Sequence, residues 1–250
     1  MNFKNPKINI ISLEEVDSTN TYAKNLAKEG MDEGTVVIAK RQTMGRGRLG
    51  RKFYSPSGTG IYMSIILKPE TDAESILLIT TAAAVAVSQA IENVTGKSTL
   101  IKWVNDIYMN EKKVCGILCE GSFRDCHTLE YAILGIGINI SKPDTPFPDE
   151  IKNIAGYILE KDDENIKEKI IEEVIDNFFN LYKNISKKPH LEIYRKRNLL
   201  SGKPVNIIQC DEIIDEGVCT GIDDDFAIII TKDNDTIKIS SGEVSVKERI

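Results

Sequence analysis

Hydrophobic positions change their spacing along the chain, and each spacing predicts a different kind of element. Short apolar runs rich in β-branched residues predict strands, because such side chains fit a pleated, half-buried surface. These runs cover residues 8–13, 34–40, 59–67, 100–109, 114–120 and 129–140. Apolar positions at the helical period predict helices, and these cover residues 21–28, 75–94, 164–185 and 191–200.

The pattern changes at Gly202. Five short strands are predicted at residues 204–210, 216–221, 226–231, 236–240 and 244–248, joined by acidic turns at 223–225 and 233–235. About fifty residues of this kind indicate a small β-barrel of SH3-like size. We therefore expect two domains, covering residues 1–200 and 201–250.

Composition indicates a soluble globular protein, with 41% hydrophobic and 28% charged residues. The net charge of −6 argues against nucleic acid or an acidic membrane as the partner of the whole molecule. The five cysteines contain no C-x-x-C pair, so reduced thiols of a cytoplasmic protein are expected rather than a zinc site. No signal peptide is recognised, and the longest apolar run, near residues 76–87, is expected to be too short for a membrane span.

Residues 41–52, RQTMGRGRLGRK, concentrate positive charge on this acidic chain. Glycine allows backbone N–H groups to approach a ligand closely, and arginine offers a fixed, always-charged fork to carboxylate or phosphate. In an arbitrary protein, we would expect such a segment to be a solvated charged turn about half of the time, because arginine–glycine pairs are common in flexible segments. Structured sequence flanks this loop on both sides, so we expect it to close over a small anionic ligand.

Other polar positions interrupt the predicted elements. Gly135 and Gly137 share one face of a strand with Asn139, which indicates a close backbone approach or a flat ligand lying across the sheet. They form no dinucleotide fingerprint, because the third glycine is absent, and no P-loop motif is present. Residues 18–20 (Ser-Thr-Asn) begin a helix, where capping alone is the simpler role. Polar residues in the 100–109 strand indicate either ligand contacts or a strand irregularity.

Four motifs carry a resemblance to a known family. GRGRLGRKFYSP, KWVND, KVCGIL and GIGIN occur in this order, and the chain resembles biotin–protein ligases (biotin–[acetyl-CoA-carboxylase] ligases) over nearly its whole length. The resemblance implies an α+β fold in which a mixed, mostly antiparallel sheet is flanked by helices, as in the class II synthetase-like biotin-lipoate ligase catalytic domain. A C-terminal SH3-like β-barrel would follow. Two positions depart from the family pattern, Val104 in place of proline and Phe53 in place of the frequent tryptophan.

The resemblance also implies roles for individual residues. Those implied to bind biotin are Ser18, Thr19, Asn20, Gln42, Gly45, Arg46, Gly47, Arg48, Lys113, Gly135 and Gly137. Those implied to bind ATP and its Mg²⁺ are Arg48, Arg51, Lys102, Asn105, Lys113 and Asn139, with the protein ligands of the metal left open. The implied catalytic residues are Lys113, Arg48 and Asp106, the last orienting or deprotonating the acceptor amine. Gly242, Glu243 and Lys247 resemble the family's end motif, which contacts ATP or the carrier domain.

The implied reaction has two steps. Biotin and Mg-ATP give biotinyl-5′-AMP and pyrophosphate, and a lysine of a biotin carboxyl carrier protein domain then attacks the acyl-adenylate. Some relatives carry an N-terminal winged-helix domain that binds DNA. The printed sequence begins close to the catalytic motifs, so no DNA partner is expected, and no membrane partner either. Edge-to-edge dimers are common in relatives, so a homodimer remains open.

Two alternatives compete with this interpretation. One is a lipoate–protein ligase or acyltransferase on the same scaffold, which the pairing of KWVND with GRGRLGR disfavours. The other is a non-catalytic biotin sensor or an RNA-binding module. The presence of Lys113 and Arg48 argues against a sensor without activity, and the acidic balance without interleaved aromatics argues against RNA.

Overall fold

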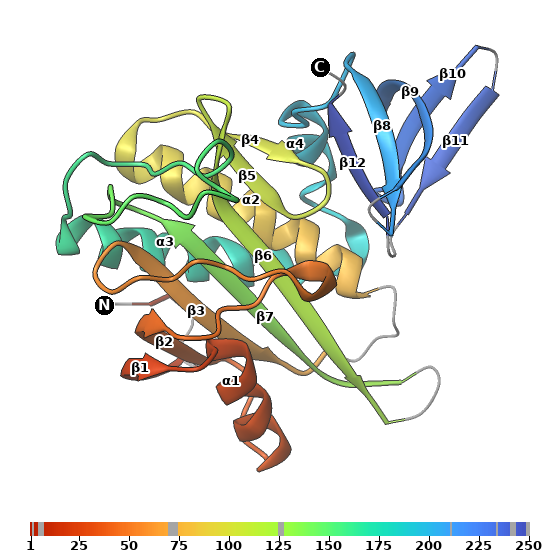
Figure 1. Ribbon diagram of the computed structural model, residues 1–250. Helices are drawn as coiled ribbons and strands as arrows, with labels where there is room; N and C mark the ends of the chain where they lie inside the picture. The colour runs from red at the N-terminus through yellow and green to blue at the C-terminus, as the bar shows by residue number, and fades with distance from the viewer. Residues whose placement is uncertain are drawn as a thin grey trace.

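A computed structural model of the chain describes residues 1, 3–4, 8–69, 75–124, 128–210, 212–233, 235–240 and 244–248. Figure 1 shows a large sheet with helices on its two faces and a second, smaller sheet beside its upper edge. The described cysteines are all unpaired, as expected for reduced thiols, and they are Cys115, Cys119, Cys210 and Cys219.

The large sheet has seven strands in the order β1-β2-β3-β7-β6-β5-β4. Their bounds are β1 Asn9–Val16, β2 Thr35–Gln42, β3 Gly60–Leu67, β4 Leu100–Lys102, β5 Asp106–Met109, β6 Lys112–Phe123 and β7 Leu129–Asn139. Only β1 and β2 pair in parallel, and every other neighbouring pair is antiparallel. The expected mixed, mostly antiparallel sheet is therefore confirmed.

One expectation about this sheet is wrong. Residues 100–109 do not form a single strand; they form the hairpin of β4 and β5, in which Lys102 pairs with Asp106. The polar residues of the KWVND motif explain the difference, because asparagine and aspartate disfavour a continuous strand and favour turns. The hairpin places Lys102 and Asp106 opposite each other instead of four residues apart along one strand.

Helices cover both faces of the sheet. They are α1 Thr19–Lys28, α2 Ser75–Thr95, α3 Glu164–Tyr182 and α4 Leu191–Lys196, with short 3₁₀ turns at Arg48–Gly50 and Ile185–Lys187. α2 packs against β4–β7 and against α3, whereas α1 packs on β2, β3 and β7 from the other side. The apolar residues at the helical period in α3 thus face α2, as the spacing predicts.

The long apolar segment is the buried centre of this fold. α2 is 21 residues long, and among the described helices it alone has the length and composition to cross a membrane. The expectation of a run too short to span is therefore wrong on length. Of the most apolar part of the helix, 72% is buried within the protein. Burial on nearly all sides explains why the helix is hydrophobic all round rather than on one stripe.

The C-terminal residues form a five-stranded antiparallel sheet in the order β11-β10-β9-β8-β12. Its strands are β8 Pro204–Gln209, β9 Glu212–Ile222, β10 Ile228–Lys232, β11 Asp235–Ile239 and β12 Val244–Glu248. Within the described residues β11 and β12 stand at opposite edges and do not pair. No closed barrel is found, because closure would require these two strands to hydrogen-bond.

The small sheet is joined to the β4–β5 hairpin by buried contacts. The indole nitrogen of Trp103 donates to the carbonyl of Phe226 over 2.9 Å, and the Tyr194 hydroxyl donates to the carbonyl of Val104 over 3.0 Å. The ring of His190 stacks on Phe226 with centroids 4.6 Å apart. The turn that carries the KWVND motif is therefore held from behind by α4 and the small sheet.

Candidate active site

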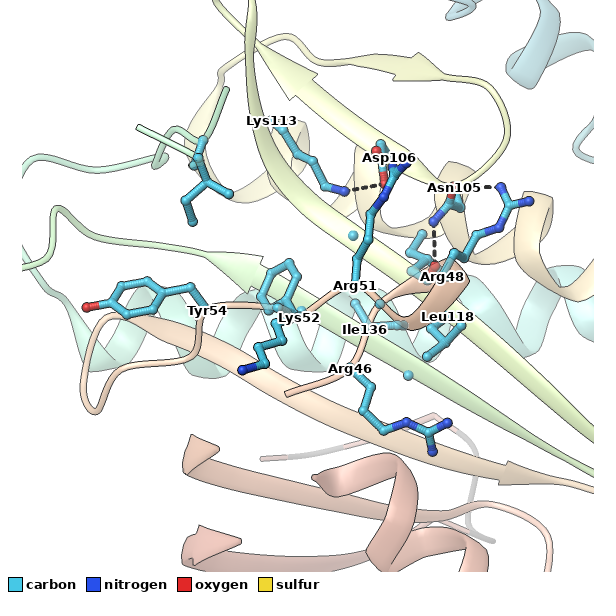
Figure 2. A pocket seen from close by; sticks show the side chains of 18 of the residues that line it. Arg46, Arg48, Arg51, Lys52, Tyr54, Asn105, Asp106, Lys113, Leu118 and Ile136 are labelled. Carbon is cyan, nitrogen blue, oxygen red and sulfur yellow. Dashed lines mark hydrogen bonds and ion pairs between the residues drawn. The ribbon is translucent and has the colours of Figure 1, made fainter. Parts of the chain in front are cut away.

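A pocket of about 690 Å³ lies on the sheet face that carries α1. Its walls come from the start of α1, the basic loop, the β4–β5 hairpin, the middle of β6 and β7, the loop near residue 151, and β12 of the small sheet. Figure 2 shows Arg48 and Arg51 passing in front of the sheet toward Asn105 and Asp106, whereas Arg46 points the other way. Segments far apart in the sequence thus meet at one cavity.

Three glycines make room for this cavity. A Cβ at Gly137 would come within 2.5 Å of the Phe53 ring, and a Cβ at Gly116 within 3.2 Å of the same ring. At Gly135 a Cβ would overlap the Asn20 side chain. The expected close approach is therefore confirmed, although side chains of the protein make it. Gly116 was missed; it pairs with Gly137 across β6 and β7, and the KVCGIL motif contained the signal.

The start of α1 carries a network of neutral polar side chains. The backbone N–H and hydroxyl of Thr19 donate to the Gln42 side-chain oxygen over 2.8 and 3.0 Å. The Ser64 hydroxyl lies 2.8 Å from the Thr19 hydroxyl and 2.6 Å from Oδ1 of Asn20. Ser18 occupies the N-cap position without a capping bond from its side chain. Capping therefore does not explain this Ser-Thr-Asn run.

Glu120, near the end of β6, connects this network to the basic loop. Its carboxylate accepts from Nδ2 of Asn20 over 2.8 Å and from Arg46 over 2.8 Å. Sequence analysis singled out neither Glu120 nor Ser64. The only available signal was the alternation of side chains along β6 and β3, which does not reveal what lies opposite.

The basic loop is ordered by its own backbone and by the hairpin. The N–H of Gly47 donates to the Arg51 carbonyl, and the backbones of Arg46 and Lys52 pair in an isolated antiparallel β-bridge. The Arg48 guanidinium donates to the Asn105 side chain over 3.2 Å, and burial lowers the pKa of Arg48 while the nearby Asp106 carboxylate opposes that shift. The loop is therefore an ordered turn with specific contacts, although Arg46, Arg51 and Lys52 are exposed.

The hairpin adds further charges to the pocket. Lys113, at the start of β6, forms an ion pair of 2.6 Å with Asp106 on β5, and both side chains are about three-quarters buried (28% and 23% exposed). Burial lowers the pKa of Lys102, Asp106 opposes this shift, and the neighbouring Lys247 strengthens it. Cations are thus gathered at this end in a partly desolvated position, where interactions with an anion are strong.

Most of the predicted site residues line the pocket. These are Ser18, Thr19, Asn20, Gln42, Arg46, Gly47, Arg48, Arg51, Lys102, Asn105, Asp106, Lys113, Gly135, Gly137 and Asn139, together with Lys247. Gly45 is not among the lining residues; its carbonyl accepts from Phe53, and a Cβ there would strike that backbone. Its role is structural in this geometry. Gly242 and Glu243 lie outside the described residues.

The acidic side chains of the described residues do not form a metal site by themselves, since no three His, Cys, Asp or Glu side chains come together there. Mg²⁺ is usually bound through one or two carboxylates together with substrate phosphates. Asp106 supplies one carboxylate at the cationic end, beside Lys113, which fits an ion held mainly by a phosphate ligand.

Comparison with known proteins identifies the family. The model of the Biotin/lipoate A/B protein ligase family matches residues 12–139, which is just over half of the chain. The chain belongs to this family. The model of the biotin protein ligase C-terminal domain matches residues 200–247 of this family member.

Individual relatives agree with the assignment. The biotin protein ligase of Aquifex aeolicus, solved in complex with biotin and ATP, is 31% identical, with a TM-score of 0.79 over 96% of this chain and 99% of that one. The bifunctional ligase/repressor BirA of Bacillus spizizenii is 42% identical over 63% of this chain and 48% of its own length. The biotin–[acetyl-CoA-carboxylase] ligase of Mycobacterium tuberculosis is 26% identical over 92% and 86%. The chain thus spans about half the length of the Bacillus relative.

Proposed function

We propose that this protein is an ATP-dependent biotin–protein ligase. The observation that carries the proposal is the division of one pocket into a neutral hydrogen-bonding end at α1 and a cationic end at the β4–β5 hairpin, in a member of this family. Biotin has a neutral ureido ring at one end and a carboxylate at the other. The ureido ring suits the end built by Thr19, Asn20 and Gln42, and the carboxylate then points toward Lys113.

The cationic end supports the first step. A biotin carboxylate oxygen forms a bond to the α-phosphorus of ATP, the bond to the bridging oxygen breaks, and pyrophosphate leaves. Two anions must meet, so Lys113 and Arg48 offset their repulsion and stabilise the charge that develops in the transition state. A magnesium ion that arrives with ATP would add charge neutralisation on the phosphates, and the Asp106 carboxylate would help to hold it.

The second step needs a neutral amine and an intact intermediate. The lysine nitrogen of the carrier domain bonds to the acyl carbon, the bond from that carbon to the AMP oxygen breaks, and the amine loses a proton. We assign Asp106 to orient this amine and accept its proton, as the family resemblance implies, and its carboxylate lies at the cationic end, 2.6 Å from the Lys113 ammonium. The loop at residues 46–52 shields the adenylate from water, which would otherwise hydrolyse it.

Mass spectrometry of a biotin carrier domain tests the proposal directly. The domain is incubated with this protein, Mg-ATP and either biotin or lipoate. Addition of one biotin to one lysine, with release of pyrophosphate, is the expected result. A carrier that gains lipoate but no biotin would overturn the proposal in favour of the lipoate ligase. Tight RNA binding without pyrophosphate release would overturn it in favour of the RNA-binding module.

Further features are proposed on the same basis. The division into domains at residues 200 and 201, an SH3-like character of the C-terminal sheet, and Mg²⁺ as the ion of ATP are consistent with the proposed reaction. We also propose a cytoplasmic location, with a carboxylase carrier subunit as the acceptor. A homodimer that pairs through an edge strand of the large sheet stays open, and analytical ultracentrifugation would measure it.

A further inference from the structure

Glu120 contacts two residues that line the pocket without lining the pocket itself. It lies on β6, with 23% of its side chain exposed, behind the start of α1 and beside the basic loop. Its carboxylate contacts Asn20 in the first turn of α1 and the partly exposed cation Arg46. These two partners belong to the two parts of the proposed ligand site, the start of α1 and the basic loop.

The first partner is Asn20, which is 5% exposed. An ionised carboxylate only accepts hydrogen bonds, so the amide nitrogen of Asn20 must face Glu120. The same nitrogen lies 3.4 Å from the carbonyl of Leu118. Oδ1 of Asn20 is therefore turned toward Ser64 and over Gly135, which lines the pocket. The shorter contact, to Glu120, and the contact to the Leu118 carbonyl together orient Asn20 so that it presents an acceptor toward the pocket.

An acceptor at this point selects the chemistry of the ligand. The Ser64 hydroxyl has a single proton, shared between Asn20 and Thr19, so Oδ1 keeps the capacity to accept a second hydrogen bond. A ligand group that hydrogen-bonds to this oxygen would have to donate an N–H or O–H. The ureido N–H of biotin satisfies this requirement, whereas the dithiolane ring of lipoate has no donor.

The second partner is Arg46, at the beginning of the basic loop, at 2.8 Å. The far end of the loop is tied to the same polar network, because Nε2 of Gln42 donates to Ser55, and Ser55 donates to the carbonyl of Phe53. An exposed ion pair contributes little when both side chains must be ordered to form it. Here Asn20 already orders the carboxylate, so the ion pair holds Arg46 at a smaller entropic cost.

We propose that Glu120 is a positioning residue that sets the acceptor orientation of Asn20 and anchors the basic loop through Arg46, so that recognition of the ligand donor and closure of the loop depend on one carboxylate. This inference rests on the proposed function and deepens it. It assigns no new chemistry to Glu120, because the residue acts only through Asn20 and Arg46.

Glu120→Gln tests the inference, because it keeps the shape, removes the charge and weakens the constraint on the Asn20 amide, which the Leu118 carbonyl alone then favours. Biotin affinity without ATP is measured by calorimetry, and dissociation of biotinyl-5′-AMP by rapid filtration. We expect biotin to bind about 5- to 10-fold more weakly and the adenylate to dissociate about 10-fold faster, the effect of losing one charge-assisted hydrogen bond. The ratio of biotin to lipoate affinity should fall as well.

A double-mutant cycle separates positioning from general destabilisation. Arg46→Ala should accelerate dissociation of the adenylate. In the double variant, the increase in the dissociation rate should be smaller than the product of the two single-variant increases, because both substitutions break the same contact. The matched control is Glu15→Gln, which breaks an Arg–Glu pair of 2.7 Å between β1 and β2 outside the pocket. This control should leave affinity and dissociation unchanged.

Two outcomes would overturn the inference. In the first, Glu120→Gln matches the Glu15→Gln control in biotin affinity and adenylate retention. In the second, the effects of Glu120→Gln and Arg46→Ala multiply fully. If Glu120→Gln does not fold, Glu120→Asp keeps the charge at shorter reach and should show an intermediate loss. A wild-type protein that binds biotin but labels no carrier would refute the proposed function while still allowing the affinity test of Glu120.

Discussion

The two ends of the pocket carry different kinds of polar group. The end at α1 is a network of neutral hydrogen-bonding groups, contributed by Thr19, Asn20, Gln42 and Ser64. The other end is cationic, with the Lys113–Asp106 ion pair and a guanidinium whose pKa is lowered by burial. A neutral network recognises shape and donor pattern, whereas partly buried cations recognise charge. For the proposed ligase, the contrast indicates that selection of biotin and activation of ATP are separable by mutation.

The largest expected effect comes from Lys113→Ala at the cationic end. Removal of a cation from the transition state should slow pyrophosphate release by about 100- to 1,000-fold. Biotin binding without ATP should change far less, because the neutral network stays intact. The neighbouring exposed residue gives the control Lys112→Ala, which should release pyrophosphate at the wild-type rate. Normal pyrophosphate release by Lys113→Ala would refute the assignment.

Low pH should destabilise the packing of α4 and the small sheet behind the β4–β5 hairpin. The His190 Nε2 lies 2.9 Å from the Thr81 hydroxyl, which donates to the Leu77 carbonyl, so Nε2 carries the proton and Nδ1 is buried without a partner. Burial lowers the pKa of His190 from 6.5 to about 4. The unfolded chain therefore binds this proton first, and stability falls as the pH drops from 6.5 toward 4.

His190→Gln measures that effect. Between neutral pH and pH 4, the folding equilibrium constant of the wild type should fall roughly 100-fold more than that of this variant. Urea unfolding at several pH values provides the measurement. The only other histidine in the sequence, His127, lies outside the described residues and supplies the comparison variant His127→Gln. An identical pH dependence of wild type and His190→Gln would contradict the prediction.

Arg48→Ala should open the cationic end without removing the ion pair. We expect biotinyl-5′-AMP to dissociate roughly 10- to 30-fold faster, since a charge-assisted hydrogen bond to Asn105 and an attraction for the phosphate are lost together. Single-turnover retention of the adenylate gives the rate. Arg41→Ala, which affects an exposed pair with Glu15, serves as its control. Equal retention in both variants would count against a closing role for Arg48.

Salt concentration should affect binding at the two ends of the pocket differently, and this is the smallest of the expected effects. Between about 0.05 M and 0.5 M KCl, the KM for ATP should rise about five-fold, because ions screen partly exposed charges. The KM for biotin should change less, by about two-fold, because only its carboxylate meets the cationic end while its ring meets neutral groups. Steady-state pyrophosphate assays give both constants. Parallel changes in the two constants would show that the ends are not separable.

Much of this architecture could be predicted from sequence because its signals are local. The apolar runs predicted most strands within a few residues, and glycines in a strand indicated close contact. The β4–β5 hairpin escaped prediction because a short apolar run with polar residues fits either one strand or two. The open C-terminal sheet escaped it because strand spacing does not say whether the edges pair.

The sequence by itself determined which chemistry is present, namely the arginine–glycine loop, Lys113, Asp106 and the small residues of β7, since these are properties of residue type and order. Tertiary structure alone decided their partners. Glu120 holds Asn20 and Arg46 from positions 100 and 74 residues away along the chain. Such contacts depend on how strands cross in space, and no local pattern encodes that geometry.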